Sequence, residues 1–230
     1  MKTLTAISIL SGGLDSSVAT LLALQQCDIA LALTFNYGQR AFLSEKKASA
    51  LLCRHYKIPH QIVDLTWLAS ISQSALNQKE KSLELLSFEN LDHLQKAQDS
   101  AKAVWVPNRN GLFINAAACF AEAMDAKYLI TGFNLEEAAT FPDNSMAFVE
   151  GINVSLSFST LKQIQVRAPL AHLTKKEIVQ KAIELELSLD SVWSCYESGE
   201  KMCGICESCL RSKRAYLESG LKDKVGEFFK

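Results

Sequence analysis

The chain has 230 residues, of which 48% are hydrophobic and 21% are charged, as in ordinary globular proteins with room for one full core. The formal net charge of −1 argues against a broad basic surface for DNA or RNA, and no apolar run has membrane-spanning length. The first residues lack the pattern of a signal peptide, so we expect a cytoplasmic protein without nucleic-acid or membrane partners.

The first predicted strand, Ala6–Leu10, leads into a turn with the sequence SGGLDSS at Ser11–Ser17, and a helix is predicted at Val18–Gln26. Two glycines let backbone N–H groups approach an anion closely, and a helix N-terminus adds unpaired donors and a favourable dipole. The turn therefore predicts a phosphate site, with a ligand-free Gly-Gly turn as the alternative. It lacks the ending of a Walker loop. Beside phosphate, Asp15 is expected to bind Mg²⁺ or to cap the helix.

The rest of the chain alternates between strand and helix patterns. Strands are predicted at Ile29–Phe35, Gln61–Leu65, Tyr128–Thr131 and Gln165–Ala168. Helices are predicted at Leu43–Tyr56, Gly111–Met124 and Thr174–Leu187, the last with a capping box formed by Thr174 and Glu177. The alternation predicts the α/β class, with a Rossmann-like parallel sheet and helices on both faces.

The segment 70–103 breaks this alternation. It is rich in Ser, Gln, Lys and Glu and has no clear period. We interpret it as an insertion over the sheet edge that can act as a lid.

Two polar stretches are expected where ligands of open α/β sheets bind, at the carboxyl ends of the strands. Phe35–Arg40, with the sequence FNYGQR, places an aromatic ring and a guanidinium beside a flexible glycine. A plain turn with a surface arginine is the alternative. Before the third predicted helix, the fork of Arg109 matches phosphate or carboxylate, and Asn110 is expected to be the N-cap.

The loop Gly132–Ser145 follows the fourth predicted strand and carries three carboxylates and two phenylalanines. Carboxylates beside aromatic rings can bind a planar purine-like ligand by pairing with its N–H edge and stacking on its face. A solvated acidic loop is the alternative. Lys175, at the start of the last predicted helix, can approach phosphates or remain solvated.

Four of the seven cysteines lie within 15 residues: Cys195, Cys203, Cys206 and Cys209. Overlapping C-x-x-C pairs with one earlier cysteine offer four thiolates to one metal, and four sulfurs favour a closed, structural Zn²⁺ site. An iron–sulfur cluster, a redox pair and a zinc ribbon that touches RNA are the alternatives. We expect the other cysteines, Cys27, Cys53 and Cys119, to be small buried hydrophobic residues. The chain is thus divided into an α/β domain at residues 1–188 and a zinc-binding tail at residues 189–230.

Taken in order, SGGLDSS, FNYGQR, VPNRN, GFNLEEAATFPDNS, APL…TKKE and the four-cysteine tail resemble the 7-cyano-7-deazaguanine synthase family of the PP-loop ATP pyrophosphatase superfamily. The resemblance implies a ligase of queuosine biosynthesis that converts 7-carboxy-7-deazaguanine, ammonia and ATP into the nitrile. The carboxylate and then the amide are adenylylated, with release of pyrophosphate and AMP. It also implies a homodimer with one structural Zn²⁺ per chain. Another PP-loop ligase or a tRNA-modifying enzyme with a different acceptor is the alternative, and a nucleotide-binding regulatory protein without turnover is a second.

The resemblance also implies roles for particular residues. ATP–Mg²⁺ is expected at Leu10, Ser11, Gly12, Gly13, Leu14, Asp15, Ser16, Ser17, Val18, Ala19 and Thr20. Catalytic roles are expected for Asp15, Arg109 and Lys175. The acceptor substrate is expected at Tyr37, Gln39, Arg40, Phe133, Glu136, Glu137 and Asp143, with Phe141 as a second stacking candidate. The chain departs from the commoner family pattern at Asn36, Asn108, Asn144 and Ser145.

Overall fold

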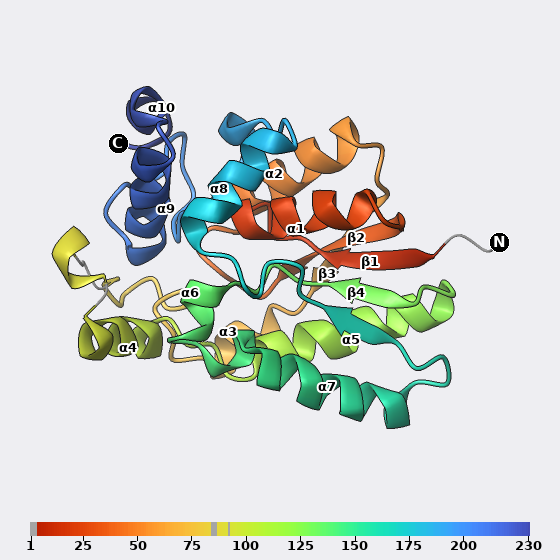
Figure 1. Cartoon of the computed structure of the whole chain (residues 1–230). Helices are drawn as coiled ribbons and strands as arrows, with labels where there is room; N and C mark the ends of the chain where they lie inside the picture. Colours follow the sequence, from red (N-terminus) through yellow and green to blue (C-terminus); the bar gives the residue numbers. More distant parts are fainter. Residues whose placement is uncertain (1–3, 84–86, 92) are drawn as a thin grey trace.

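The computed structural model describes residues 4–83, 87–91 and 93–230. Its centre is a parallel sheet with the strand order β3-β2-β1-β4-β5 (Figure 1). The strands are β1 (Thr5–Ile9), β2 (Asp28–Asn36), β3 (His60–Asp64), β4 (Tyr128–Ile130) and β5 (Gln165–Arg167). Each predicted strand is confirmed, as is the Rossmann-like parallel sheet.

Helices cover both faces of the sheet, as predicted (Figure 1). One face carries α1 (Leu14–Leu24), α2 (Phe42–His55) and α8 (Lys175–Glu184), and the other carries α5 (Arg109–Ala123) and α7 (Met146–Ser159). The central strand is therefore buried on both sides, with Ala6 in one hydrophobic cluster and Ile7 in the other. The capping box of Thr174 and Glu177 is present at the start of α8.

The helix α7 is absent from the predicted elements. It is 14 residues long and contains one glycine and three serines, which are weak helix formers. Its packing on β5 and α5 stabilises it instead of local propensity.

The start of α5 corrects a second expectation. The N-cap is Asn108, in the left-handed conformation with φ of 49°, and not Asn110. Asparagine adopts this conformation at lower cost than most residues. Its side chain then lies over Gly111, where an added Cβ would come within 2.3 Å of the Asn108 Oδ1 atom. Asn110 thus falls in the first turn and is buried.

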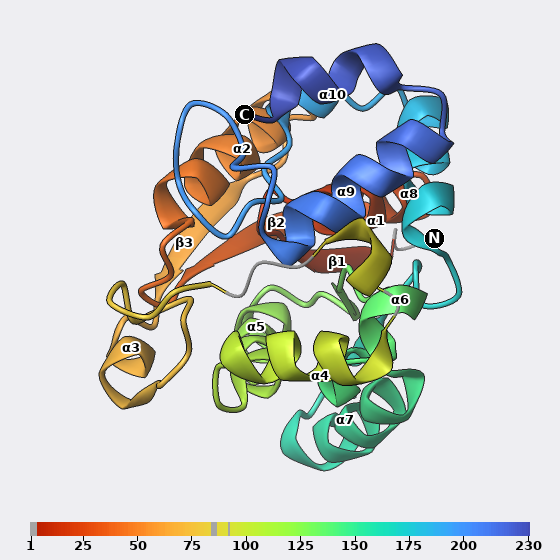
Figure 2. The same cartoon turned by 90° about the vertical axis from the view of Figure 1, so that its left-hand side faces the viewer.

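The described parts of the segment 70–103 lie at the carboxyl ends of the strands (Figure 2). It contains the end of α3 (Trp67–Ile71), the 3-10 turn η1 (Phe88–Asn90) and α4 (Leu94–Ala103). Ser100 Oγ donates to Glu207 Oε2 over 2.6 Å, which joins α4 to the C-terminal region. Residues 84–86 and 92 lie outside the described residues, and closure of this segment over a ligand stays a prediction.

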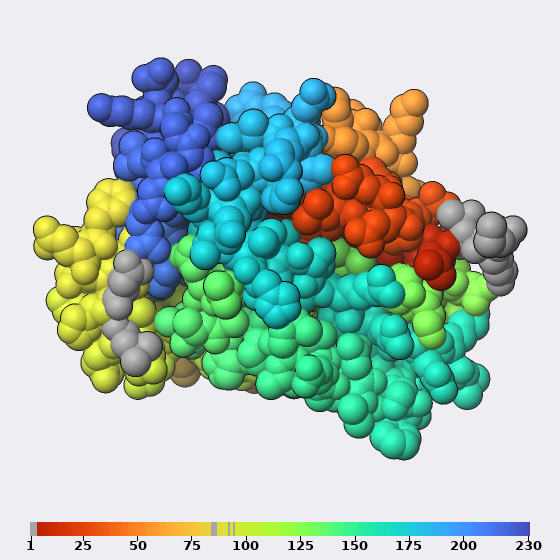
Figure 3. Space-filling view, in the orientation of Figure 1, coloured from red at the N-terminus to blue at the C-terminus, as the bar shows by residue number. Residues whose placement is uncertain are grey.

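The C-terminal region contains η3 (Leu189–Ser191), α9 (Glu207–Glu218) and α10 (Lys222–Phe228). It packs on α8, and the fully buried Tyr216 belongs to the same hydrophobic cluster as Leu14 of α1 and Ile178 of α8. In the space-filling view, the atoms of α8 (cyan) and those of the C-terminal region (blue) lie side by side (Figure 3). The domain boundary at residue 188 stays a prediction. Within the described ranges, no helix combines the length and apolarity needed to cross a membrane.

Candidate functional site

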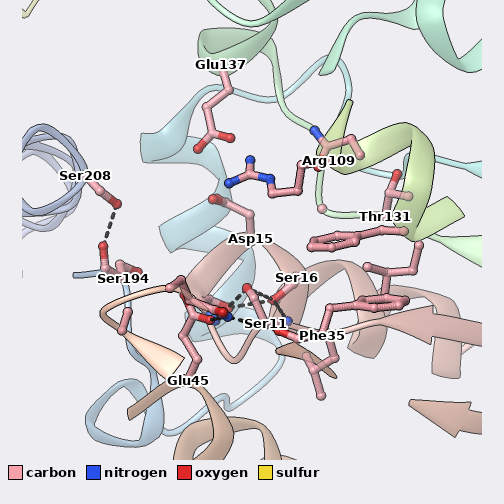
Figure 4. A pocket seen from close by; sticks show the side chains of 18 of the residues that line it. Ser11, Asp15, Ser16, Phe35, Glu45, Arg109, Thr131, Glu137, Ser194 and Ser208 are labelled. Atoms are coloured by element: carbon pink, nitrogen blue, oxygen red, sulfur yellow. Dashed lines mark hydrogen bonds between the residues drawn. The ribbon is translucent and has the colours of Figure 1, made fainter. Parts of the chain in front are cut away.

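A cavity of about 240 Å³ opens at the carboxyl ends of β1, β2 and β4 (Figure 4). Its walls come from six parts of the chain: the loop after β1, the end of β2 with the start of α2, Leu76, the first turn of α5, the loop after β4, and residues 193–196 with Ser208 of the C-terminal region. Sequence position predicts the loop after β1, the end of β2, the first turn of α5 and the loop after β4. It predicts neither the start of α2 nor the C-terminal residues.

The loop after β1 forms the floor of the cavity. Gly12 has φ of 76°, and a Cβ there would come within 2.7 Å of Ala48 Cβ and 2.8 Å of the Glu45 carbonyl oxygen, so only glycine fits. The hydroxyls of Ser11 and Ser16 lie 3.0 Å apart (Figure 4). The N-cap of α1 is Gly13, which has no side-chain acceptor for the N–H groups of the first turn. Hydroxyls and helix N–H groups at one place can cradle phosphate oxygens.

Lys175 joins two carboxylates beside this loop. Its Nζ lies 2.5 Å from Asp15 Oδ2 and 3.2 Å from Glu137 Oε1, and the residue is only 4% exposed. Burial raises the pKa of Asp15 to about 6 against the opposing effect of the lysine. For Glu137 and Lys175 the ion pairs outweigh burial, which lowers the pKa of the carboxyl and raises that of the amine. The sequence-predicted Asp15, Glu137 and Lys175 thus form one buried charged cluster.

Asp15 has an unused oxygen in this cluster. Its Oδ1 is buried, and among the described residues it has no hydrogen-bond partner. A buried carboxylate oxygen without a partner costs free energy unless a ligand satisfies it. A second carboxylate lies close by at Glu137, and carboxylate oxygens are the ligands that Mg²⁺ prefers.

Arg109 enters the cavity from the first turn of α5 (Figure 4). Its Nη1 donates to Tyr37 Oη over 3.3 Å, and its guanidinium carbon lies 5.5 Å from the centre of that ring. Burial works to lower the pKa of Arg109, but Tyr37 and Asp143 outweigh it and raise that pKa. Tyr37 therefore positions the charged guanidinium of Arg109, which can bind an anion in the cavity.

The other predicted substrate residues divide between the cavity and its surroundings. Tyr37, Gln39 and Phe133 line it. Arg40 instead binds Glu197 Oε1 and the Gln78 carbonyl oxygen, each at 2.6 Å, and does not line it.

Three further candidates, Glu136, Phe141 and Asp143, are not among the residues that line this cavity. Glu136 accepts from the Lys175 backbone N–H over 2.7 Å and from Arg214 over 3.2 Å. Phe141 lines an adjoining pocket of about 110 Å³ and stacks on Trp105 with centroids 6.5 Å apart. Burial raises the pKa of the Asp143 carboxyl, which lies near Arg109. The predicted roles of these residues stay predictions.

Glu45 is a site residue that sequence reasoning misses. It lies in the first turn of α2, lines the cavity and accepts a hydrogen bond from Gln39 Nε2 over 2.7 Å (Figure 4). Burial raises the pKa of its carboxyl to about 7. The only sequence signal for Glu45 is its position about one helical turn after the FNYGQR stretch. A glutamate early in a helix is common on protein surfaces, so this position does not indicate a site residue.

The connection to the C-terminal region, residues 192–197, is the second missed feature, and we call it the strap. Trp193 N–H donates to the Gly12 carbonyl oxygen over 2.9 Å, and Leu14 N–H donates to Ser194 Oγ over 3.4 Å. Ser208 Oγ in turn donates to the Ser194 carbonyl oxygen over 2.5 Å (Figure 4). Cys195 marks this stretch as part of the cysteine cluster, but no residue in it indicates a contact with the loop after β1, so only the fold brings it to the cavity.

The strap leads directly into the four-cysteine cluster. The four sulfurs all lie within 4.8 Å of one another, and those of Cys203 and Cys209 are 3.8 Å apart. A tetrahedral site with metal–sulfur bonds of about 2.3 Å has sulfurs about 3.8 Å apart, so the four cysteines fit a metal ion. Gly204 supports the turn between them with φ of 77°.

The remaining cysteines only partly match their expectation. Cys53 is buried as predicted, but Cys27 is half-buried and Cys119 is exposed. Cys119 lies in α5 on a position that faces solvent, where its Sγ contacts the Asn115 carbonyl oxygen one turn earlier.

Comparison with known proteins bears on both the fold and the family of this chain. Two solved structures share the fold: a 4-thiouridine synthetase in complex with RNA and bound ATP, and the U34-tRNA thiolase NcsA from Methanococcus maripaludis with its 4Fe-4S cluster. The synthetase has a TM-score of 0.52 and 20% identity over 98% of this chain and 53% of its own. The thiolase has a TM-score of 0.51 and 17% identity over 98% of this chain and 68% of its own.

The family model described as "Queuosine biosynthesis protein QueC" matches residues 5–220. The chain belongs to the QueC family. A QueC relative from Methanosarcina mazei, named 7-cyano-7-deazaguanine synthase, is 45% identical over 96% of this chain and 97% of its own. One of the same name from Pelotomaculum thermopropionicum is 48% identical over 94% of this chain and 98% of its own. The QueC match spans both the loop after β1 and the four cysteines.

Proposed function

We propose that this chain is a 7-cyano-7-deazaguanine synthase that makes the nitrile from 7-carboxy-7-deazaguanine, ammonia and ATP in queuosine biosynthesis. The observation that carries the proposal is the near full-length similarity to QueC relatives with that name. The cavity supports it, because the loop after β1 and Arg109 line it, and the buried Lys175 bonds to Asp15 in its wall. We propose small molecules as the substrates, and a cytoplasmic homodimer as the form of the enzyme.

The first step needs a neutralised polyphosphate and a carboxylate held against its α-phosphorus. The loop at Ser11–Ser17 binds the outer phosphates through N–H and hydroxyl donors. Lys175 and Arg109 offset the charge of the departing pyrophosphate, while the substrate carboxylate oxygen attacks the α-phosphorus. The products are an acyl adenylate and pyrophosphate.

Mg²⁺ would neutralise phosphate charge in this site when it accompanies ATP. Asp15 and Glu137 are the residues that would hold it, since Asp15 Oδ1 has no partner among the described residues. Each carboxylate now shares Lys175. A cation that takes over the carboxylates would release the lysine amine toward the phosphates.

Ammonia then displaces AMP from the acyl adenylate and leaves an amide. A second ATP activates the amide oxygen, and AMP leaves with that oxygen as the nitrile forms. Stacking on Phe133 and pairing with buried carboxylates would orient the deazapurine ring in both rounds. The cysteine cluster would hold Zn²⁺ in a closed structural site, without an open position for substrate.

The test follows AMP release from ATP–Mg²⁺ and ammonium, with and without 7-carboxy-7-deazaguanine, and identifies the product by mass. We expect nitrile and two AMP molecules for each nitrile. Asp15→Ala should abolish AMP formation while the circular dichroism spectrum stays that of a folded protein. Silence with this acceptor would move the proposal to another adenylylated substrate, and normal turnover by the Asp15 variant would contradict the role of the loop.

A further inference from the structure

The carboxylates of the cavity differ in what neutralises them. Within the described part of the chain, Asp15, Glu45 and Glu137 are the carboxylates that line it. Asp15 and Glu137 both form ion pairs with Lys175. Glu45 has no ion-pair partner among the described residues, and within them Gln39 Nε2 is the hydrogen-bond donor to its side chain. Of the three, Glu45 is thus the carboxylate that no ion pair within the described residues occupies, and it can bind a cation of its own.

Gln39 fixes the orientation of this carboxylate. Its Nε2 donates to Glu45 Oε2 over 2.7 Å and to the Phe35 carbonyl oxygen over 3.0 Å, and its Oε1 accepts from the Tyr37 N–H over 2.9 Å. The bonds to Phe35 and Tyr37 fix the Gln39 amide against the turn, and its remaining N–H group points at Glu45 Oε2. Glu45 Oε1 is not involved in that contact and remains for a ligand, in a cavity that Glu45 shares with the phosphate loop.

We propose that Glu45 binds the ammonium ion of this reaction and acts as the base that converts it to the attacking ammonia. The inference rests on the proposed function, because only an acyl adenylate in the same cavity gives ammonia a target. Ammonium is a small cation with four N–H donors, and a half-buried carboxylate without an ion-pair partner among the described residues both attracts it and accepts its proton.

The step balances as follows. One N–H bond of ammonium breaks, its proton goes to Glu45 Oε1, and the nitrogen keeps the electron pair. That pair forms the C–N bond at the acyl carbon, and the C–O bond to phosphate breaks so that AMP leaves with its electrons. A second proton passes from the nitrogen to solvent, which leaves a neutral amide, and Glu45 returns its proton to solvent before the next turnover.

The groups that face Glu45 suit a base near neutral pH. Arg109 of α5 and Gln39 of the preceding turn favour the charged carboxylate, and Tyr37 is a neutral neighbour whose own pKa is raised by burial. Burial outweighs these effects and raises the pKa of Glu45 to about 7. Glu45 thus differs from an exposed carboxylate, which would be too weak a base to take a proton from ammonium at useful rates.

The experiment separates adenylylation from amide formation in Glu45→Gln, which can still accept from Gln39 Nε2. Adenylylation is measured as exchange of labelled pyrophosphate into ATP that depends on 7-carboxy-7-deazaguanine and needs no ammonia. Amide formation is measured with ammonium and with hydroxylamine, which is mostly unprotonated at neutral pH and needs no base. Glu150→Gln, on the exposed surface of α7, is the matched control.

We expect Glu45→Gln to retain exchange and the hydroxylamine reaction, and to lose about 100-fold in kcat/KM for ammonium at pH 7. The loss should shrink as the pH rises, since free ammonia then reaches the adenylate without a base. An unchanged kcat/KM for ammonium would overturn the inference, as would equal losses with both nucleophiles. Absence of exchange in the unmodified enzyme would instead overturn the proposed function, and this inference with it.

Discussion

At the level of single residues, Lys175 determines the charge balance of the site. Its amine is buried between Asp15 and Glu137 at 2.5 and 3.2 Å. We expect Lys175→Met to lower the free energy of unfolding at pH 7 by about 3–5 kcal/mol, because removal of one partner leaves buried charges without compensation. AMP formation should be lost as well.

The pH dependence of this variant tests the cause. Without the lysine, the pKa values of both carboxyls in the folded protein lie above those in the unfolded chain, so the folded state binds more protons. Stability lost at pH 7 should therefore return in part as the pH falls through those raised values, and urea unfolding at several pH values measures it. Lys181→Met, which breaks the exposed pair with Glu184 on the same helix, should cost at most about 1 kcal/mol. Equal losses in the two variants would contradict a buried charged cluster.

At the level of elements, the turn between β1 and α1 depends on glycine. We expect Gly12→Ala to displace the loop, because φ of 76° and contacts below 3 Å leave no room for a Cβ. Nucleotide affinity, measured by calorimetry with a non-hydrolysable ATP analogue, should fall together with stability. Gly151→Ala is the matched control. A Cβ added at this position inside α7 would meet no atom of another segment within 4 Å, and alanine should stabilise that helix by about 0.5–1 kcal/mol. A Gly12 variant with unchanged affinity would contradict the role of the turn.

The elements themselves were predictable where local pattern and tertiary packing agree. Buried parallel strands have short apolar sequences, and a capping box marks the first residue of α8. These elements can therefore be predicted from the sequence. The helix α7 does not, because its serines and Gly151 argue against the helix that packing on β5 enforces. The N-cap of α5 is Asn108 and not the predicted Asn110 for a similar reason. The left-handed conformation of Asn108 depends on its contact with Gly111, which the local sequence pattern does not show.

The candidate site shows the same division. Asp15, Arg109 and Lys175 could be named from the sequence because they stand next to predicted strand and helix ends, where α/β sheets bind ligands. Arg40 and Glu136 have residue types and positions of the same kind, yet the structure gives them protein partners at Glu197 and Arg214. Sequence position places a residue near a site, whereas its contacts depend on packing over distances that the local pattern does not encode.

At the level of the whole molecule, the strap links the ends of the chain. Trp193 and Ser194 bond to Gly12 and Leu14 of the phosphate loop across about 180 residues of sequence. The next residue, Cys195, is the first of the four clustered cysteines. The geometry of the loop and the folding of the cysteine cluster should therefore depend on each other.

Loss of the metal should accordingly weaken nucleotide binding as well as the fold. We expect Cys206→Ser to lower the metal content, the melting temperature and the affinity for a non-hydrolysable ATP analogue together, because the strap would lose its anchor. Conversely, the nucleotide should tighten metal binding by the same factor, since coupling between two binding sites is reciprocal. Cys119→Ser, exposed on α5, is the control and should change none of these quantities. A Cys206 variant that lacks metal, remains folded and binds the analogue as tightly as the unmodified protein would show that the loop is independent of the cluster.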